Sequence, residues 1–161
     1  MIIVVMGVEG SGKTTVGALL ADQLGWEFAD GDSFHPASNI EKIRHNIPLD
    51  DADRAPWLKA MHNAIRQWRE QQRNAVLGCS VLKRSYREQL GIGPGVRLVH
   101  LKGDPELIAR RLQTRHGHFA KPELLASQFA ALEEPGNAIT VDVSRAPEEI
   151  VREIRKQLGL T

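Results

Sequence analysis

The segment Gly7–Thr14, which reads Gly-Val-Glu-Gly-Ser-Gly-Lys-Thr, limits what this chain can fold into more than any other feature. Its spacing is that of a phosphate-binding loop: glycine, four residues, glycine, lysine, and then serine or threonine. An apolar run at residues 2–6 precedes the segment, and a helix-forming run at residues 15–21 follows it. This strand–loop–helix context predicts a loop that wraps phosphate groups with its backbone N–H groups at a helix N-terminus.

The side chains at the end of this loop predict its chemistry. Lys13 can reach the β- and γ-phosphates of a nucleotide, and the hydroxyl of Thr14 can ligate Mg²⁺. The glycines allow the backbone to approach a phosphate closely. The alternative, a glycine-rich turn that binds nothing, is weakened by the strand and helix on either side.

Length and composition indicate an ordinary globular domain. The chain has 161 residues, of which 42% are hydrophobic and 25% are charged. A net charge of +1 gives no reason to expect nucleic acid or a membrane surface as a partner. The single cysteine, Cys79, excludes an internal disulfide and suits a reducing compartment. With no signal-like segment and no apolar run of membrane-spanning length, we expect a cytoplasmic protein.

Strand-like and helix-like segments alternate along the chain. This alternation predicts an α/β fold with a parallel sheet that is covered by helices on both faces. We expect strands at residues 2–6, 26–29, 75–79, 96–101 and 139–143. We expect helices near residues 15–21, 37–44, 83–90, 104–115 and 124–132, a long helix with Asp53 as its N-cap, and a last helix opened by Pro147.

Two carboxylates, Asp30 and Asp32, stand at the end of the second expected strand. Ligands of parallel sheets bind beyond the carboxyl ends of the strands. A kinase needs one carboxylate near Mg²⁺ and another near the attacking hydroxyl, so we expect at least one of the two to be functional. The alternative is a solvated acidic turn. His35 follows directly, and as a lone histidine it is as readily structural as a substrate contact.

Basic residues also gather at the expected sheet edge. Arg54 lies near the start of the long helix, and Lys83 and Arg87 are one helical turn apart, so these two can face one point. Such cations suit an anionic substrate, because arginine can grip a carboxylate with two hydrogen bonds. Ordinary surface charge is the alternative for any one of them.

A second basic group, Arg110, Arg111 and Arg115, precedes an interruption at residues 116–123. Arginines on a segment that closes over a phosphate site can neutralise the transferring charge and exclude water. A basic helix C-terminus that complements the helix dipole is the alternative.

Several stretches resemble the family of gluconate kinases. Residues 31–42 contain His-Pro-Ala-Ser-Asn-Ile-Glu-Lys, and residues 47–58 contain Pro-Leu-Asp-Asp-Ala-Asp-Arg-Ala-Pro-Trp-Leu, both similar to segments typical of that family. These two segments are far more specific than the phosphate loop, which many unrelated enzymes share. Further pieces that resemble the family are residues 79–87, 101–104 and 115–119, so the similarity covers nearly the whole chain in order.

The resemblance implies ATP-dependent phosphorylation of D-gluconate at its 6-hydroxyl, which gives 6-phospho-D-gluconate. It also implies a shikimate-kinase-like fold with a five-stranded parallel sheet. We accordingly expect one P-loop kinase domain over residues 1–161, with a substrate-binding insertion at about 33–73 and a lid at about 114–125. The family includes dimers, so a homodimer is among the expected assemblies.

The family roles carry over onto matching positions of this sequence. Lys13 and Asp32 would be catalytic, with Asp32 accepting the proton of the attacking hydroxyl. Thr14 would ligate Mg²⁺, with Asp30 in its outer shell. The resemblance assigns nucleotide contacts to Gly10, Ser11, Gly12, Lys13, Thr14, Thr15, Arg111 and Arg115, and substrate contacts to Asp32, His35, Arg54, Lys83, Arg87 and His118.

Three positions depart from the family pattern, and one of them is Val81, where the family usually has alanine. Glu9 adds a negative charge beside a phosphate site, so we expect its side chain to point outward. Asn46 stands where the family often has glycine, and asparagine tolerates the left-handed backbone that such a position requires.

Three alternatives to a gluconate kinase share the phosphate loop. A kinase for another small polyol or hydroxy acid, such as shikimate, uses the same fold. A nucleoside or nucleotide kinase does not resemble residues 31–58. A GTP-dependent switch normally carries Asn-Lys-x-Asp, which this sequence lacks. ATP turnover with gluconate, shikimate, nucleosides or no acceptor separates these alternatives.

Overall fold

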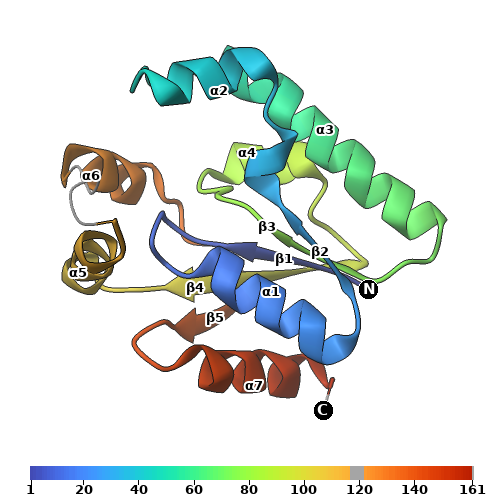
Figure 1. The fold of residues 1–161 in the computed structure, drawn as a ribbon. Helices are drawn as coiled ribbons and strands as arrows, with labels where there is room; N and C mark the ends of the chain where they lie inside the picture. The colour runs from blue at the N-terminus through green and yellow to red at the C-terminus, as the bar shows by residue number, and fades with distance from the viewer. Residues whose placement is uncertain (117–121, 161) are drawn as a thin grey trace.

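The computed structural model describes residues 1–116 and 122–160, with residues 115, 116 and 122 described only as parts of their helices. Five strands alternate with helices along the chain (Figure 1). The strands are β1 (Ile2–Met6), β2 (Glu27–Asp30), β3 (Ala75–Gly78), β4 (Val96–Lys102) and β5 (Ile139–Asp142). The α-helices are α1 (Lys13–Leu24), α2 (Ala37–Arg44), α3 (Asp51–Glu70), α4 (Arg84–Leu90), α5 (Pro105–His116), α6 (Pro122–Ala131) and α7 (Pro147–Leu158), and a short 3-10 helix, η1 (Gly31–Phe34), follows β2.

The five strands form one parallel sheet in the order β2-β3-β1-β4-β5, which confirms the predicted architecture. The central strand β1 pairs with β3 on one side and with β4 on the other. Because all strands run the same way, their carboxyl ends meet at one edge. The phosphate loop after β1, the acidic turn after β2 and the segment after β4 therefore lie along that edge.

Side chains of alternate residues in β1 point to opposite faces of the sheet and build two cores. Ile3 and Val5 belong to a core under α1 and α7, and Ile2 and Val4 belong to a core under α3 and α4. Figure 1 shows the two helix layers on either side of the sheet. The tryptophans of α3 and the apolar face of α7 are core residues, as their helical spacing predicted.

The start of α3 corrects one prediction. Asp50, and not Asp53, is the N-cap, and Asp53 is the third residue of the helix. The two form a reciprocal capping box: the Asp50 side chain accepts from Asp53 N–H at 2.7 Å, and the Asp53 side chain accepts from Asp50 N–H at 3.0 Å. The sequence alone does not distinguish the two, because Asp50 and Asp53 both stand shortly before the apolar positions of the helix and both are residues that favour the N-cap.

The remaining differences between expected and observed elements are small. Helix α6 begins at Pro122 rather than near residue 124, and Lys83 is the N-cap of α4 rather than its first residue. Asn46 has a φ of 56°, and Glu9 is exposed, both as expected. Within residues 1–116 and 122–160, every helix is too short or too polar to cross a membrane.

Helices α2 and α3 both lie between β2 and β3, within the range expected to form the substrate-binding insertion. Figure 1 shows both on the side of the sheet where α4 lies, with α3 running above β2 and β3. Residues 117–121 of the expected lid at about 114–125 lie outside the described residues. The division into core, insertion and lid stays a prediction.

Candidate active site

The loop between β1 and α1 presents free backbone donors to the sheet edge. Gly12 is the N-cap of α1, with a φ of 97°, and it contributes no capping side chain. The first hydrogen bond of the helix runs from Val16 N–H to Gly12 C=O at 2.8 Å, so the N–H groups of residues 13–15 precede any partner inside the helix. No acidic residue occupies the first turn of α1. This helix end can therefore receive an anion.

Helix α5 holds the outer side of the loop in place. Gly10 has a φ of +82°, and a Cβ atom there would lie 2.8 Å from Leu112 Cγ and 3.2 Å from Ile108 Cγ2. Only glycine fits both the backbone conformation and this close approach. Ser11 Oγ is buried and has no hydrogen-bond partner among the described residues, so it is available to a ligand.

Lys13 extends over the loop from the first position of α1. Its Nζ donates a hydrogen bond to Val8 C=O at 3.1 Å. Burial lowers the pKa of Lys13, and the nearby carboxylate of Asp32 is the largest of the charges that oppose this shift. A desolvated ammonium beside a loop with free N–H groups is suited to a phosphate.

The two carboxylates after β2 are held in different ways. Asp30 caps η1, and its Oδ1 accepts a hydrogen bond from Asp32 N–H at 2.9 Å. Asp32 is exposed and acts electrostatically on Lys13. The structure thus brings Asp32 into the phosphate-loop region, as expected for a group near the transferring phosphate.

A divalent cation has limited protein ligands here. Within the part of the chain that the structure describes, no group of three or more histidine, cysteine or acidic residues could hold a metal ion. Mg²⁺ in kinases is bound through one or two protein groups together with substrate phosphates. Exposed Thr14 and half-buried Asp30 fit this arrangement only when a nucleotide supplies the other ligands.

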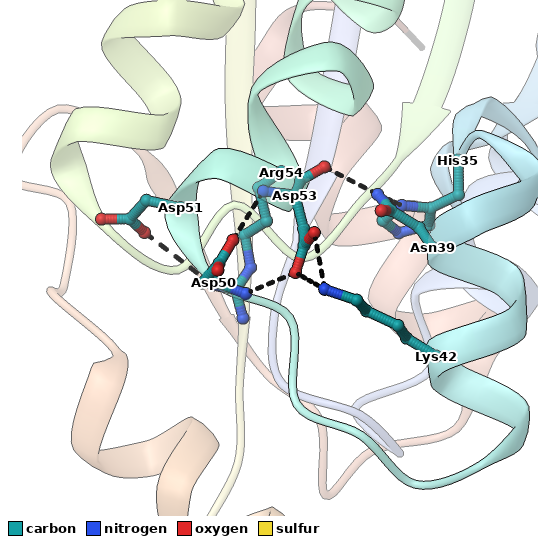
Figure 2. A network of polar contacts seen from close by, with 7 residues as sticks. All are labelled: His35, Asn39, Lys42, Asp50, Asp51, Asp53 and Arg54. Carbon is teal, nitrogen blue, oxygen red and sulfur yellow. Dashed lines mark hydrogen bonds and ion pairs between the residues drawn. The ribbon is translucent and has the colours of Figure 1, made fainter.

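A polar network joins α2 to the start of α3 (Figure 2). Lys42 Nζ lies 2.9 Å from Asp53 Oδ1 and 2.8 Å from Asp53 Oδ2. Asn39 Nδ2 lies 2.7 Å from the Asp53 carbonyl oxygen and 3.1 Å from His35 Nδ1. The network fixes His35, an expected substrate contact, relative to the helix that carries Arg54.

Two of the expected substrate cations meet at one aromatic ring. Arg54 Nη1 donates to Tyr86 Oη at 3.1 Å, and Arg54 Cζ lies 5.4 Å from the centroid of the ring. Lys83 Nζ lies 5.6 Å from the same centroid. The Tyr86 hydroxyl donates to Asp51 Oδ1 at 2.7 Å. Tyr86 thus orients both cations. Its place three residues after Lys83 is a sequence signal for this role, but that spacing is equally common between residues that do not touch.

Arg87 is placed differently from the other two cations. Its side chain is buried, and Nη1 donates to the carbonyl oxygens of Val81 at 2.8 Å and Leu82 at 2.9 Å. Nη2 donates to the carbonyl oxygen of Glu133 at 2.7 Å. The pKa of Arg87 is lowered, and burial is the main cause. This placement favours a structural role, and contact with a substrate stays an untested prediction.

The expected nucleotide arginines lie along α5. Arg111 is half-buried. The pKa of the Asp142 carboxyl is lowered mainly by a hydrogen bond from Ser144 N–H, and the charge of Arg111 lowers it further. Arg110, not Arg111, lines a cavity of about 910 Å³ between α5 and the ends of β4 and β5. The side chain of Arg115 and all of His118 lie outside the described residues.

These features together define a kinase of the phosphate-loop class. The family model described as shikimate kinase matches residues 9–159. A gluconokinase of Gluconobacter oxydans is 47% identical over 156 residues, which cover 94% of this chain and 88% of its own length. The chain belongs to the shikimate kinase family and, within it, to the gluconokinases.

Further relatives agree with this assignment. The thermoresistant gluconokinase of Escherichia coli is 42% identical over 155 residues, covering 93% of this chain and 89% of that protein. The crystal structure of a gluconokinase from Sinorhizobium meliloti superposes with a TM-score of 0.88 at 41% identity, covering 98% of this chain and 90% of that one. The protein is therefore an enzyme that transfers phosphoryl groups.

Proposed function

We propose that this enzyme transfers the γ-phosphoryl group of ATP to the 6-hydroxyl of D-gluconate, giving 6-phospho-D-gluconate. The observation that carries the proposal is Lys13 over the phosphate loop, with the Asp32 charge close enough to act on it, next to an insertion that carries His35 and Arg54. Gluconokinases similar over more than nine tenths of this chain support gluconate as the acceptor.

In the proposed reaction, Lys13 and the N–H groups of residues 13–15 hold the phosphates and stabilise the charge that develops on them. Asp32 is exposed and lacks a cation bonded to its carboxylate in the described structure, so it is free to orient the attacking hydroxyl and accept its proton. Mg²⁺, when bound, would neutralise phosphate charge, and Thr14 and Asp30 are the residues that would hold it.

The acceptor is held by residues of the insertion and of α4. Arg54 and Lys83, both directed to Tyr86, are the cations proposed to bind the gluconate carboxylate. His35 is proposed to contact a hydroxyl group. Arg111, Arg115 and His118 are proposed to act from the lid side. Arg87 is proposed to support this site through the segment that it braces, and its direct contact with gluconate stays an untested prediction.

A coupled assay of ATP turnover tests the proposal. Purified protein is given ATP and Mg²⁺ with gluconate, shikimate, a nucleoside or no acceptor. We expect turnover with gluconate to exceed that with every other acceptor, and the product to carry phosphate on its 6-oxygen by ³¹P–¹H correlation. Faster turnover with shikimate would contradict the proposed substrate while leaving the kinase assignment intact.

Two further expectations belong with this proposal. Work in the cytoplasm is proposed because the chain has a single cysteine, Cys79, which is free. Burial raises the pKa of its thiol to about 12, so we expect it to be unreactive. A homodimer is proposed from the family alone, and light scattering of the purified protein measures it directly.

A further inference from the structure

His35 is held in a fixed plane by two neighbours. Its imidazole ring stacks on the indole of Trp57, with ring centroids 4.6 Å apart and planes 10° apart. Trp57 is itself 3% exposed, and its Nε1–H donates to the carbonyl oxygen of Gly31 at 2.8 Å. The stack therefore ties His35 to the turn that carries Asp30 and Asp32.

The amide of Asn39 has only one orientation that fits its surroundings. Asn39 is 1% exposed, and its Nδ2 lies 2.7 Å from the Asp53 carbonyl oxygen. A carbonyl oxygen only accepts hydrogen bonds, so the amide group that faces it must be NH₂. Rotating the amide by half a turn would place two acceptor oxygens at that distance inside the protein, which costs the full penalty of a buried unpaired group.

This orientation decides where the proton of His35 resides. The same Nδ2 lies 3.1 Å from His35 Nδ1 and has no lone pair, so its second hydrogen points at that ring nitrogen. Nδ1 must then accept, which places the hydrogen of the neutral ring on Nε2. An imidazolium would set Nδ1–H against an amide hydrogen. We propose that Asn39 is a positioning residue that holds His35 as the neutral Nε2–H tautomer, so that His35 offers the substrate a single uncharged donor.

The charges around His35 agree with a neutral ring. Burial, the largest cause, lowers the pKa of His35. Asp32 on η1 raises this pKa, and Arg54 on α3 lowers it. Neither Asn39 nor Trp57, which contact the ring directly, carries a charge, and Lys42 is paired with Asp53.

The tautomer has a consequence for substrate choice, which rests on the proposed function. Asp32 is an acceptor and His35 Nε2–H is a donor, and the two are three residues apart on one turn. A hydroxyl group can donate to the first and accept from the second, whereas a carboxylate or phosphate oxygen cannot donate to Asp32. The pair therefore selects a hydroxyl-bearing part of the acceptor, and the acid group is left to Arg54 and Lys83.

Nitrogen NMR of the substrate-free protein tests the tautomer directly. In ¹⁵N-labelled protein, long-range ¹⁵N–¹H correlations distinguish protonated from unprotonated ring nitrogens, and comparison with His35→Gln assigns the His35 signals. We expect a protonated Nε2 and an unprotonated Nδ1 at pH 7.5. In Asn39→Ala we expect a mixture of tautomers, and in Asn63→Ala, an exposed asparagine of α3, we expect no change. A protonated Nδ1 in the parent protein would overturn the proposal whatever the substrate is.

Kinetics separate positioning from general damage. In Asn39→Ala we expect KM for gluconate to rise about 2- to 12-fold, the equivalent of one neutral hydrogen bond. We also expect the acidic limb of kcat/KM to move to higher pH, because protonation of Nδ1 is no longer opposed. His35→Gln, which keeps a donor and cannot titrate, should lack that limb.

A fall in kcat/KM that is uniform with pH in Asn39→Ala would overturn the proposal and leave Asn39 a structural residue. The outcome is distinguishable from failure of the proposed function. If the parent protein ignores gluconate while NMR shows the Nε2–H tautomer, the assignment of Asn39 is supported and only the substrate is wrong.

Discussion

Lys13 carries the charge on which the proposed transfer depends most. Its ammonium lies over the phosphate loop, and burial lowers its pKa, so the protein holds it there at some cost to its own stability. For Lys13→Ala we expect kcat to fall about 100- to 1000-fold, the usual loss for one group that stabilises transition-state charge. The melting temperature should stay the same or rise, because a desolvated charge is removed.

Steady-state kinetics and thermal unfolding of Lys13→Ala, beside Lys59→Ala as an exposed-lysine control, check this expectation. Near-normal kcat in Lys13→Ala would contradict the phosphate-loop mechanism.

Asp32 is the candidate base, and Asp30 is engaged with the backbone of η1. Replacing Asp32 with asparagine keeps the shape but removes the ability to accept a proton. We expect kcat to fall about 100- to 10 000-fold, as for other general bases, with ATP affinity changed much less. Equilibrium binding of ATP with Mg²⁺ is the second measurement. Should ATP binding collapse while turnover survives, Asp32 belongs to the metal site and Asp30 becomes the candidate base.

Arg54 and Arg87 give a matched pair, because both are arginines of the expected substrate site with different surroundings. Arg54→Ala should raise KM for gluconate about 10- to 150-fold, the equivalent of a charge-assisted hydrogen bond of about 1.5–3 kcal/mol, and leave KM for ATP nearly unchanged. For sorbitol, which lacks the carboxylate, the rise in KM on the same substitution should be much smaller. An equal rise in KM for gluconate and for sorbitol would mean that Arg54 does not bind the acid group.

Arg87→Ala should instead destabilise the fold. The carbonyl oxygens of Val81 and Leu82, which are buried, and that of Glu133, which is partly buried, lose their donor, and we expect a loss of about 2–4 kcal/mol in the free energy of unfolding. Urea denaturation measures that loss. A stable Arg87→Ala protein with a raised KM for gluconate alone would instead support the prediction that Arg87 contacts the substrate.

At the scale of the elements, the α2–α3 connection is the part that links fold to acceptor binding. Asp53 serves both the capping box of α3 and the ion pair with Lys42. For Asp53→Ala we expect a small loss of stability, mostly from the broken capping box, because partly exposed ion pairs contribute little. KM for gluconate should rise while KM for ATP stays unchanged. Glu41 makes its contacts at the surface, so Glu41→Ala should change neither the stability nor KM for gluconate.

The elements also show what sequence reasoning can and cannot reach. Pro147 at a helix start, the helical spacing of apolar residues in α3 and the order of strands were predictable, since each depends on local pattern. The capping role of Asp50, the inward direction of Arg87 and the contacts of Asn39 were not. These depend on which backbone carbonyl or amide lies opposite after packing, and residue spacing carries no information about that.

At the scale of the molecule, the sheet order places the site and also buries a titratable group beneath it. His100 on β4 is 2% exposed, and its Nδ1 has no hydrogen-bond partner among the described residues. It lines the cavity between α5 and the ends of β4 and β5, together with the paired side chains of Lys102 and Glu134. Burial lowers the pKa of His100, and Lys102 and Arg87 lower it further against the opposing charge of Glu134.

This shift predicts how stability depends on pH. Above about pH 7.5 His100 is neutral in both the folded and the unfolded chain and contributes nothing. As the pH falls through about 6.5, His100 is protonated in the unfolded chain but stays neutral in the folded protein. Stability therefore decreases until the pH reaches the lowered pKa of His100 in the folded state. The pKa of His35 is lowered as well and adds a loss of the same sign. Carboxyls with lowered pKa values, such as Glu134 and Asp142, contribute only at more acidic pH.

Thermal unfolding of the parent protein, His100→Gln and His45→Gln from pH 8 to pH 5 isolates this contribution. His45→Gln, at an exposed histidine, is the control for removing a histidine from the surface. His100→Gln should lower the slope, because glutamine binds no proton in either state, and the remaining slope should fall again when His35→Gln is added. Parallel curves for the parent and His100→Gln would mean that the folded protein protonates His100 as readily as the unfolded chain does. In that case a group in the cavity would stabilise the protonated ring of His100, and burial would not oppose its charge.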